Sequence, residues 1–126
     1  YGPQQKKIWL IPELIRKVKY NKIITVNNTV IKRDLIYVDD LNKAIIKSIF
    51  LKKKFTILNI GSGKSFTIKY IIETLQKLLK KRVILRDRKI LRKNEILETK
   101  YDISKAKRIL NWRPIFNLNK GLKKLI

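Results

Sequence analysis

Apolar residues recur every three to four positions in several stretches of this 126-residue chain, which is the spacing of a helix that buries one face. Pro12 fits the first turn of the first such helix, where a missing backbone N–H costs nothing. Asp39 is expected to cap the second helix, and Ser65 or Thr67 the third. The helices predicted in this way cover residues 10–18, 40–49, 68–79, 103–110 and 118–122.

Short β-prone stretches separate these helices. Residues 55–60 are apolar and end at Gly61-Ser62-Gly63, which predicts a buried strand followed by a tight turn. A second apolar run covers residues 35–38, and residues 86–100 are charged and predict an irregular, mobile loop. Two shorter strands are predicted at residues 23–26 and 83–85. The alternation of helices and strands argues for an α/β or α+β architecture.

The charge of the chain changes this picture little. Lys and Arg number 32 against 9 acidic residues, a formal net charge of +23, which invites a nucleic-acid interpretation. The basic residues are spread over every segment, however, and few aromatic residues are interleaved with them for base stacking. A solvated Lys-rich surface explains the charge, and no specific nucleic-acid partner is expected.

Two residue types are missing altogether. The sequence has neither Cys nor His, so it can form no disulfide and no thiolate metal site, and any metal would need carboxylates alone. No apolar run reaches the roughly 18 residues that span a bilayer. These features predict a cytoplasmic protein with no metal site and no membrane partner.

Residues 61–65, Gly-Ser-Gly-Lys-Ser, end like a phosphate-binding P-loop, but the loop is too short. The motif needs a further Gly five residues before Gly63, where this chain has Leu58. The dinucleotide-binding pattern fails as well, because Phe66 stands where its third Gly would be. We therefore interpret this segment as a structural turn, and no cofactor-binding residue is assigned.

Tyr101 and Lys105 have the spacing at which a Lys can lower the pKa of a Tyr base on the same helix face. In a chain this rich in Lys, one such match among five tyrosines is expected by chance. Asp102 is better interpreted as the cap of the helix that follows. No catalytic residue is assigned in this chain.

Several separated motifs carry a family resemblance. They are Tyr1-Gly2-Pro3, the run Arg33-Asp34-Leu35-Ile36-Tyr37-Val38-Asp39-Asp40, Asn59-Ile60-Gly61-Ser62-Gly63, Asp102-Ile103-Ser104-Lys105-Ala106-Lys107 and Leu110-Asn111-Trp112-Arg113-Pro114. In this order and at this spacing they resemble the C-terminal part of the extended short-chain dehydrogenase/reductase family. That family contains the NAD-dependent nucleotide-sugar epimerases and dehydratases.

The resemblance implies an α/β fold in which residues 1–126 form the substrate-binding lobe of a Rossmann-type enzyme. It implies that the Rossmann portion, with bound NAD and a catalytic Tyr-x-x-x-Lys, precedes Tyr1. The parent protein would be a homodimer that acts at C4 of the hexose of a nucleotide sugar. The segment alone would be inactive, since it lacks the cofactor motif and the catalytic pair.

The resemblance also assigns substrate-binding residues. Arg33 opens the family's Arg-Asp motif, whose Arg binds the nucleotide diphosphate, although Leu35 stands where the family has an aromatic residue. A guanidinium suits that task because it offers bidentate donors at fixed geometry. Residues 92–95 resemble the family's Arg-x-Gly-Asp stretch, which assigns phosphate to Arg92 and a ribose or loop contact to Glu95. Gln5 is assigned to the wall of the same pocket.

Other interpretations stay open at this stage. Arg33 could instead form an ion pair with Asp34 or another nearby acid, and residues 92–95 could be one more charged loop. The chain could be a stand-alone, degenerate relative without activity. A basic nucleic-acid-binding module is the remaining alternative.

Overall fold

The computed structural model describes residues 1–52 and 55–126. The helices are α1 (Leu10–Tyr20), α2 (Val38–Ile49), α3 (Ile68–Leu79), α4 (Ser104–Leu110) and α5 (Leu118–Lys123). The strands are β1 (Ile23–Val26), β2 (Lys32–Asp34), β3 (Ser65–Thr67) and β4 (Ile84–Asp87). The mixture of helices and short strands confirms the predicted class.

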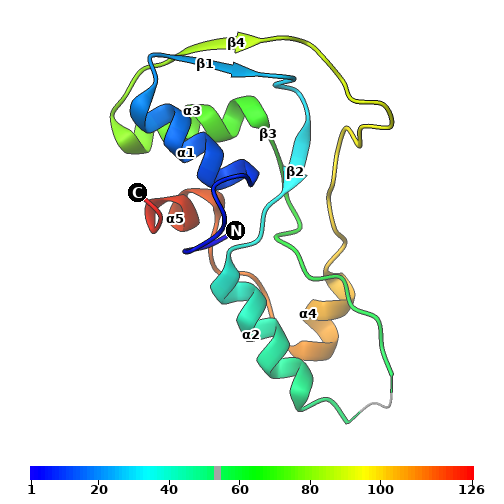
Figure 1. Ribbon diagram of the computed structural model, residues 1–126. Coiled ribbons are helices and arrows are strands. Elements are labelled where there is room, and N and C mark those ends of the chain that lie inside the picture. Colours follow the sequence, from blue (N-terminus) through cyan, green and yellow to red (C-terminus); the bar gives the residue numbers. More distant parts are fainter. Residues whose placement is uncertain (53–54) are drawn as a thin grey trace.

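The larger core lies in the upper half of Figure 1, where β1 and β4 run side by side above α1 and α3, with α5 below them. The two strands are parallel, with Ile23 opposite Ile84 and Val26 opposite Asp87. The apolar faces of the three helices meet beneath this pair. The buried side chains there are Ile11, Leu14, Val18, Ile24, Ile31, Ile68, Ile71, Ile72, Leu75, Leu118 and Leu122.

A second, smaller core lies between α2 and α4. Its buried residues are Ala44, Ile103, Ala106, Leu110 and Trp112. Asp40 in α2 joins the segment after α4 to this core. Its Oδ2 accepts hydrogen bonds from the backbone N–H groups of Ile115 at 3.0 Å and Phe116 at 2.8 Å. The backbone carbonyl of Asp40 also accepts the indole N–H of Trp112 at 3.0 Å. Asp40 is therefore a structural residue.

The helix predictions are confirmed, but the caps predicted at Asp39 and Asp102 are misplaced. The hydroxyl of Thr67 accepts the backbone N–H of Tyr70 at 3.0 Å and caps α3, whereas Ser65 lies in β3. Asp39 does not cap α2, because that helix begins two residues earlier than predicted, at Val38, with Tyr37 as its N-cap. Asp39 lies instead in the first turn, where a carboxylate favours the positive end of the helix dipole.

The buried strand predicted at residues 55–60 is wrong. Residues 55–60 form neither helix nor strand, and Phe55 and Ile57 are 81% and 68% exposed. Only the alternate side chains Leu58 and Ile60 pack against the smaller core. High β-propensity alone does not make a strand here, because no strand in the described part of the chain pairs with these residues and one side of the segment stays open to solvent.

Candidate functional site

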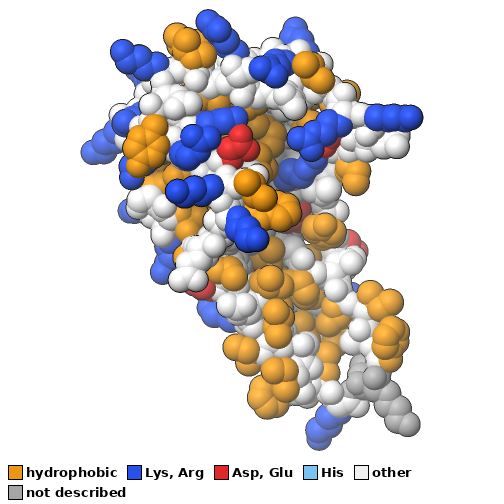
Figure 2. Space-filling model, in the orientation of Figure 1, with side chains coloured by type: hydrophobic (Ala, Val, Ile, Leu, Met, Phe, Trp, Pro, Cys, Tyr) orange, Lys and Arg blue, Asp and Glu red, His pale blue; other side chains and the backbone are white. Residues whose placement is uncertain are grey.

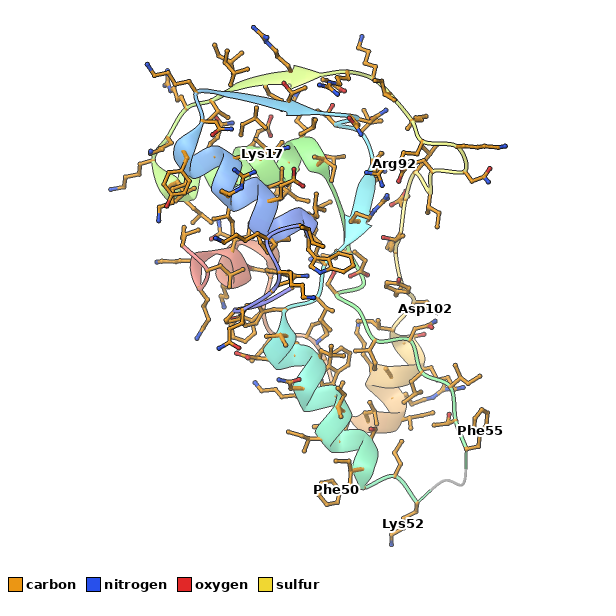
Figure 3. All side chains as sticks on the ribbon, in the orientation of Figure 1. Lys17, Phe50, Lys52, Phe55, Arg92 and Asp102 are labelled. Carbon is orange, nitrogen blue, oxygen red and sulfur yellow. The ribbon has the colours of Figure 1, made fainter. Side chains whose placement is uncertain are left out.

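A cleft of about 560 Å³ opens beside α1, between the end of β1, strand β2 and the segment that follows β4. Its charged lining residues are Glu13, Lys17, Arg33, Arg92 and Glu95. Figure 3 shows Lys17 on α1 and Arg92 on the long segment after β4, so widely separated parts of the chain supply the charges. Aliphatic side chains of the larger core form the rest of the wall, including Leu14, Val26 and Ile68.

Arg33 is held rigidly on β2. Its Nη2 forms an ion pair with Oε1 of Glu95 at 2.6 Å, and both side chains are largely covered, at 25% and 16% exposed. Its Nη1 donates to the backbone carbonyls of Ile96 at 2.7 Å and Lys32 at 2.9 Å. These three contacts use three of the five guanidinium N–H groups and leave two for a ligand.

Arg92 and Glu95 come from one tight turn. The backbone N–H of Glu95 donates to the carbonyl of Arg92 at 3.0 Å, and Asn94 adopts the left-handed conformation with φ of 60°. Asn tolerates that conformation better than most residues, so it can stand where the resembled family has Gly. The turn places Arg92 on the same cleft as Arg33, as the two assignments require.

Asp34 does not pair with Arg33. Its carboxylate instead accepts the backbone N–H of Ser62 at 2.7 Å, the Ser62 hydroxyl at 2.6 Å, the N–H of Gly63 at 3.0 Å and the N–H of Tyr101 at 3.2 Å. Gly63 has φ of +73°, which a side chain would strain. The amides that a phosphate loop would present are therefore occupied, and the interpretation of this segment as a structural turn is confirmed.

Tyr101 is also shown not to share a helix with Lys105. Helix α4 begins at Ser104, so Tyr101 precedes it and its backbone is fixed by Asp34. Asp102 does not take the N-cap position, which Ile103 occupies, but its Oδ1 accepts the backbone N–H of Ser104 at 2.9 Å. Within the described residues, no group of three or more acidic, His or Cys side chains could hold a metal ion.

Gln5 lies apart from the other assigned residues. It lines a different pocket, on the other side of α1, together with Gln4, Lys7 and Arg16. Gln4, the residue before Gln5, adopts the left-handed backbone conformation with φ of 62°. The Oε1 atom of Gln5 is buried there and has no hydrogen-bond partner within the described residues. The structure therefore does not bring Gln5 to the cleft of Arg33 and Arg92.

The cleft is also lined by Trp9, Glu13 and Lys17, to which the sequence motifs assigned no role. Lys17 forms an ion pair with Glu13 at 2.7 Å and donates to the carbonyl of Thr25 at 3.4 Å. Trp9, immediately before α1, lines the same cleft. The signal was the four-residue spacing of Glu13 and Lys17, which places them on one helix face beside the buried Leu14.

Glu98 anchors the segment that carries Arg92 and Glu95. Its carboxylate accepts the hydroxyl of Ser65, and it lies 3.4 Å from Nζ of Lys32. The Ser65 hydrogen bond and, to a lesser extent, the charge of Lys32 lower the pKa of Glu98 below its ordinary 4.5. Because the folded-state pKa is lowered, the carboxylate stabilises the fold above about pH 4.5, and this contribution is lost as the pH falls.

We therefore expect Glu98→Gln to lower the melting temperature at pH 7, with a difference from wild type that shrinks as the pH falls below 4.5. Thermal denaturation between pH 7 and pH 3 measures it. Glu73→Gln on the exposed face of α3 is the control and should change little at any pH. A Glu98→Gln effect that stays constant across this range would contradict the assigned anchor.

Comparison with known proteins identifies the family. The model of the GDP-mannose 4,6 dehydratase family matches residues 1–125 of this chain. The chain belongs to this family of NAD-dependent nucleotide-sugar epimerases and dehydratases. The resemblance described from the sequence motifs is thereby confirmed.

Individual members of this epimerase and dehydratase family agree. The chain is 38% identical to the dTDP-4-dehydro-6-deoxyglucose reductase of Escherichia coli. The match covers 100% of this chain and 41% of that protein. It is 33% identical to the UDP-glucuronate 4-epimerase of Thermodesulfobacterium geofontis, again over its whole length and 39% of the relative. The chain thus spans about two fifths of the length of these relatives.

A solved structure supports the same family fold. The UDP-glucuronic acid 4-epimerase of Bacillus cereus, in complex with UDP-glucuronic acid and NAD, superimposes with a TM-score of 0.88 at 29% identity. The match covers 98% of this chain and 40% of that enzyme. Among the residues of this chain that the structure describes, no helix is long and apolar enough to cross a membrane.

Proposed function

We propose that the cleft beside α1 binds the diphosphate of a nucleotide sugar, and that this chain is the substrate-binding lobe of an NAD-dependent enzyme acting at hexose C4. The observation that carries the proposal is the convergence of Arg33, Arg92 and Lys17 on one cleft that also has an aliphatic wall. A nucleotide diphosphate needs both features, cations for its two phosphates and apolar surface for its rings.

Arg33 is the principal phosphate ligand in this proposal. Glu95 and two backbone carbonyls fix its guanidinium before substrate arrives, so little side-chain freedom is lost on binding. Arg92 is exposed and completes a clamp from the opposite segment. Positioning of the sugar is then the contribution of this lobe to catalysis, because the reacting carbon must be held against the cofactor.

We propose C4 of the hexose as the reacting carbon because the names of the family and of two relatives all refer to position 4 of a sugar. They are a 4,6 dehydratase, a 4-epimerase and a reductase of a 4-dehydro sugar. All three kinds of reaction are served by a lobe that presents C4 of a hexose to a nicotinamide. The proposal therefore covers hydride transfer at that carbon, with NAD as the cofactor of the parent protein.

The described residues do not fit an NAD site of their own. The only Gly-x-Gly turn in the sequence, at residues 61–63, has its backbone N–H groups bound by Asp34, so they cannot cradle a pyrophosphate. We propose that a Rossmann portion preceding Tyr1 holds NAD. A cytoplasmic location, supported by the absence of Cys, and a homodimeric parent protein belong to the same proposal.

An apolar face supports this division of the protein. In the lower half of Figure 2, hydrophobic side chains gather over the end of α2 and the segment that begins at Phe55. The exposed ones include Ile46, Ile49, Phe50, Phe55 and Ile57. Figure 3 shows Phe50 and Phe55 at this lower end of the molecule. A patch of this kind, beside an extended segment with no strand partner, suits packing against another domain.

The test of the domain proposal is to read the gene in frame upstream of Tyr1. A Gly-x-x-Gly-x-x-Gly turn after a first strand, and a Tyr-x-x-x-Lys shortly before Tyr1, are the expected result. A start codon or an in-frame stop codon shortly before Tyr1 would leave this lobe without a Rossmann portion. That result would overturn the enzymatic part of the proposal.

The test of binding is calorimetry of the parent protein with UDP, dTDP and GDP and with their hexose conjugates. At least one nucleotide diphosphate should bind, and its affinity should fall as salt rises, because the contacts are charged. Absence of binding by every nucleotide in the panel would overturn the proposal.

A further inference from the structure

Trp9 is the exposed one of the two tryptophans in this chain. Its side chain is 56% exposed, whereas the other tryptophan, Trp112, is 4% exposed in the smaller core. Within the described residues the Trp9 ring takes part in none of the aromatic or cation–π pairs. A tryptophan left open on a surface forfeits the burial that normally stabilises it, and such residues are enriched where a partner covers them.

The backbone of Trp9 is nevertheless fixed. Its N–H donates to the carbonyl of Lys6 at 3.1 Å, and its own carbonyl accepts the N–H of Glu13 at 3.0 Å, the first hydrogen bond of α1. The backbone therefore holds Trp9 at one end of α1, where it lines the same cleft as Arg33 and Arg92. A residue whose backbone is already fixed loses less freedom when a ligand packs on its side chain.

The cleft has two distinct ends along α1. Lys17 lies eight residues beyond Trp9, which is about 12 Å along the helix axis. At the Lys17 end, the side chain of Lys17 reaches the carbonyl of Thr25 in β1. At the Trp9 end, α1 begins on the side of the molecule nearer to α2, as Figure 1 shows. The apolar face that we assign to the cofactor-binding portion lies farther in the same direction, at the C-terminal end of α2.

The orientation of the ligand follows from this arrangement. The hexose must reach a cofactor that the described residues do not hold, so it has to leave the cleft at the end nearer to α2. The diphosphate lies between hexose and nucleoside and meets Arg33 and Arg92. The nucleoside is then directed toward Lys17 and the hexose toward Trp9.

We propose that Trp9 packs against the apolar face of the hexose ring and so positions the sugar, an inference that rests on the proposed function. A pyranose exposes C–H groups on its faces, and an aromatic ring offers a flat apolar surface to cover them. Trp9 would thereby contribute to binding of the sugar conjugate but not of the free nucleotide.

The experiment compares matched ligands by calorimetry on the parent protein: UDP-glucose with UDP, and dTDP-glucose with dTDP. For Trp9→Ala we expect affinity for the sugar conjugate to fall about 3- to 10-fold while affinity for the matching nucleotide is unchanged. Trp9→Phe should recover most of the loss, because it keeps a flat ring. The unchanged nucleotide affinity shows at the same time that the cleft of the variant is folded.

Each other result is decisive. Equal weakening of the conjugate and the nucleotide would place Trp9 on the nucleotide and overturn the inference, as would unchanged affinity for both. If neither nucleotide binds to the wild-type protein, or if Arg33→Ala leaves nucleotide affinity unchanged, the proposed function falls and this inference with it. If Trp9→Ala does not selectively weaken sugar-conjugate binding but Arg33→Ala does weaken nucleotide binding, only the inference about Trp9 is overturned and the proposed function stands.

Discussion

Replacement of Arg33 by Ala is expected to weaken nucleotide-diphosphate binding by about 1.5–3 kcal/mol, roughly 10- to 150-fold in the dissociation constant. Arg33 is fixed by Glu95, Ile96 and Lys32 and keeps two N–H donors for the ligand. Its loss removes a charged hydrogen bond and leaves the carboxylate of Glu95 unpaired beside the phosphates. Calorimetry of the parent protein with UDP or dTDP measures the effect.

Two further variants separate these contributions. Arg108→Ala removes the same charge from the exposed surface of α4 and should leave affinity unchanged, because Arg108 does not line the cleft. Adding Glu95→Gln to Arg33→Ala should recover part of the lost affinity, since it removes the unpaired carboxylate. Equal losses from Arg33→Ala and Arg108→Ala would show that only overall charge matters and would contradict the assignment.

The second large effect concerns stability. Asp34→Ala is expected to lower the free energy of unfolding by about 3–5 kcal/mol, because it leaves several backbone N–H groups without their acceptor. Its carboxylate joins β2 to the turn at Ser62 and Gly63 and to the segment at Tyr101. Urea denaturation of the parent protein, followed by a probe that reports this lobe, measures the loss.

The matched control for this variant is Asp102→Ala. Asp102 is exposed and accepts a single backbone N–H, that of Ser104, so its removal should cost no more than about 1 kcal/mol. If the two variants were equally stable, Asp34 would not join the three segments as described. Nucleotide binding by Asp34→Ala has to be measured at a temperature where this variant is folded, because an unfolded protein cannot report on the binding role of a residue.

The sequence predicted the helices well because each has a strong apolar stripe. Helix α3 buries Ile71, Ile72 and Leu75 at helical spacing, and the hydroxyl of Thr67 caps it. Strands β2 and β3 escaped prediction because each has only three residues, and Lys32-Arg33-Asp34 shows no apolar alternation. Their pairing depends on a partner more than 30 residues away, which a local pattern cannot contain.

The site divides in the same way. The motif resemblance pointed to Arg33, Arg92 and Glu95, and the structure gathers all three at one cleft. The ion pair between Arg33 and Glu95 joins residues 62 positions apart, so spacing alone could not select it over Asp34. Gln5 lies on the other side of α1, next to Gln4 with its left-handed backbone, and its assignment to the substrate pocket stays a prediction.

The most direct test of the central claim is a crystal structure of the parent protein grown with UDP or with dTDP. We expect the diphosphate between the guanidinium groups of Arg33 and Arg92, with hydrogen bonds from Arg33 to its oxygens. A nucleotide bound elsewhere on the protein, with the cleft beside α1 free of it, would contradict the account.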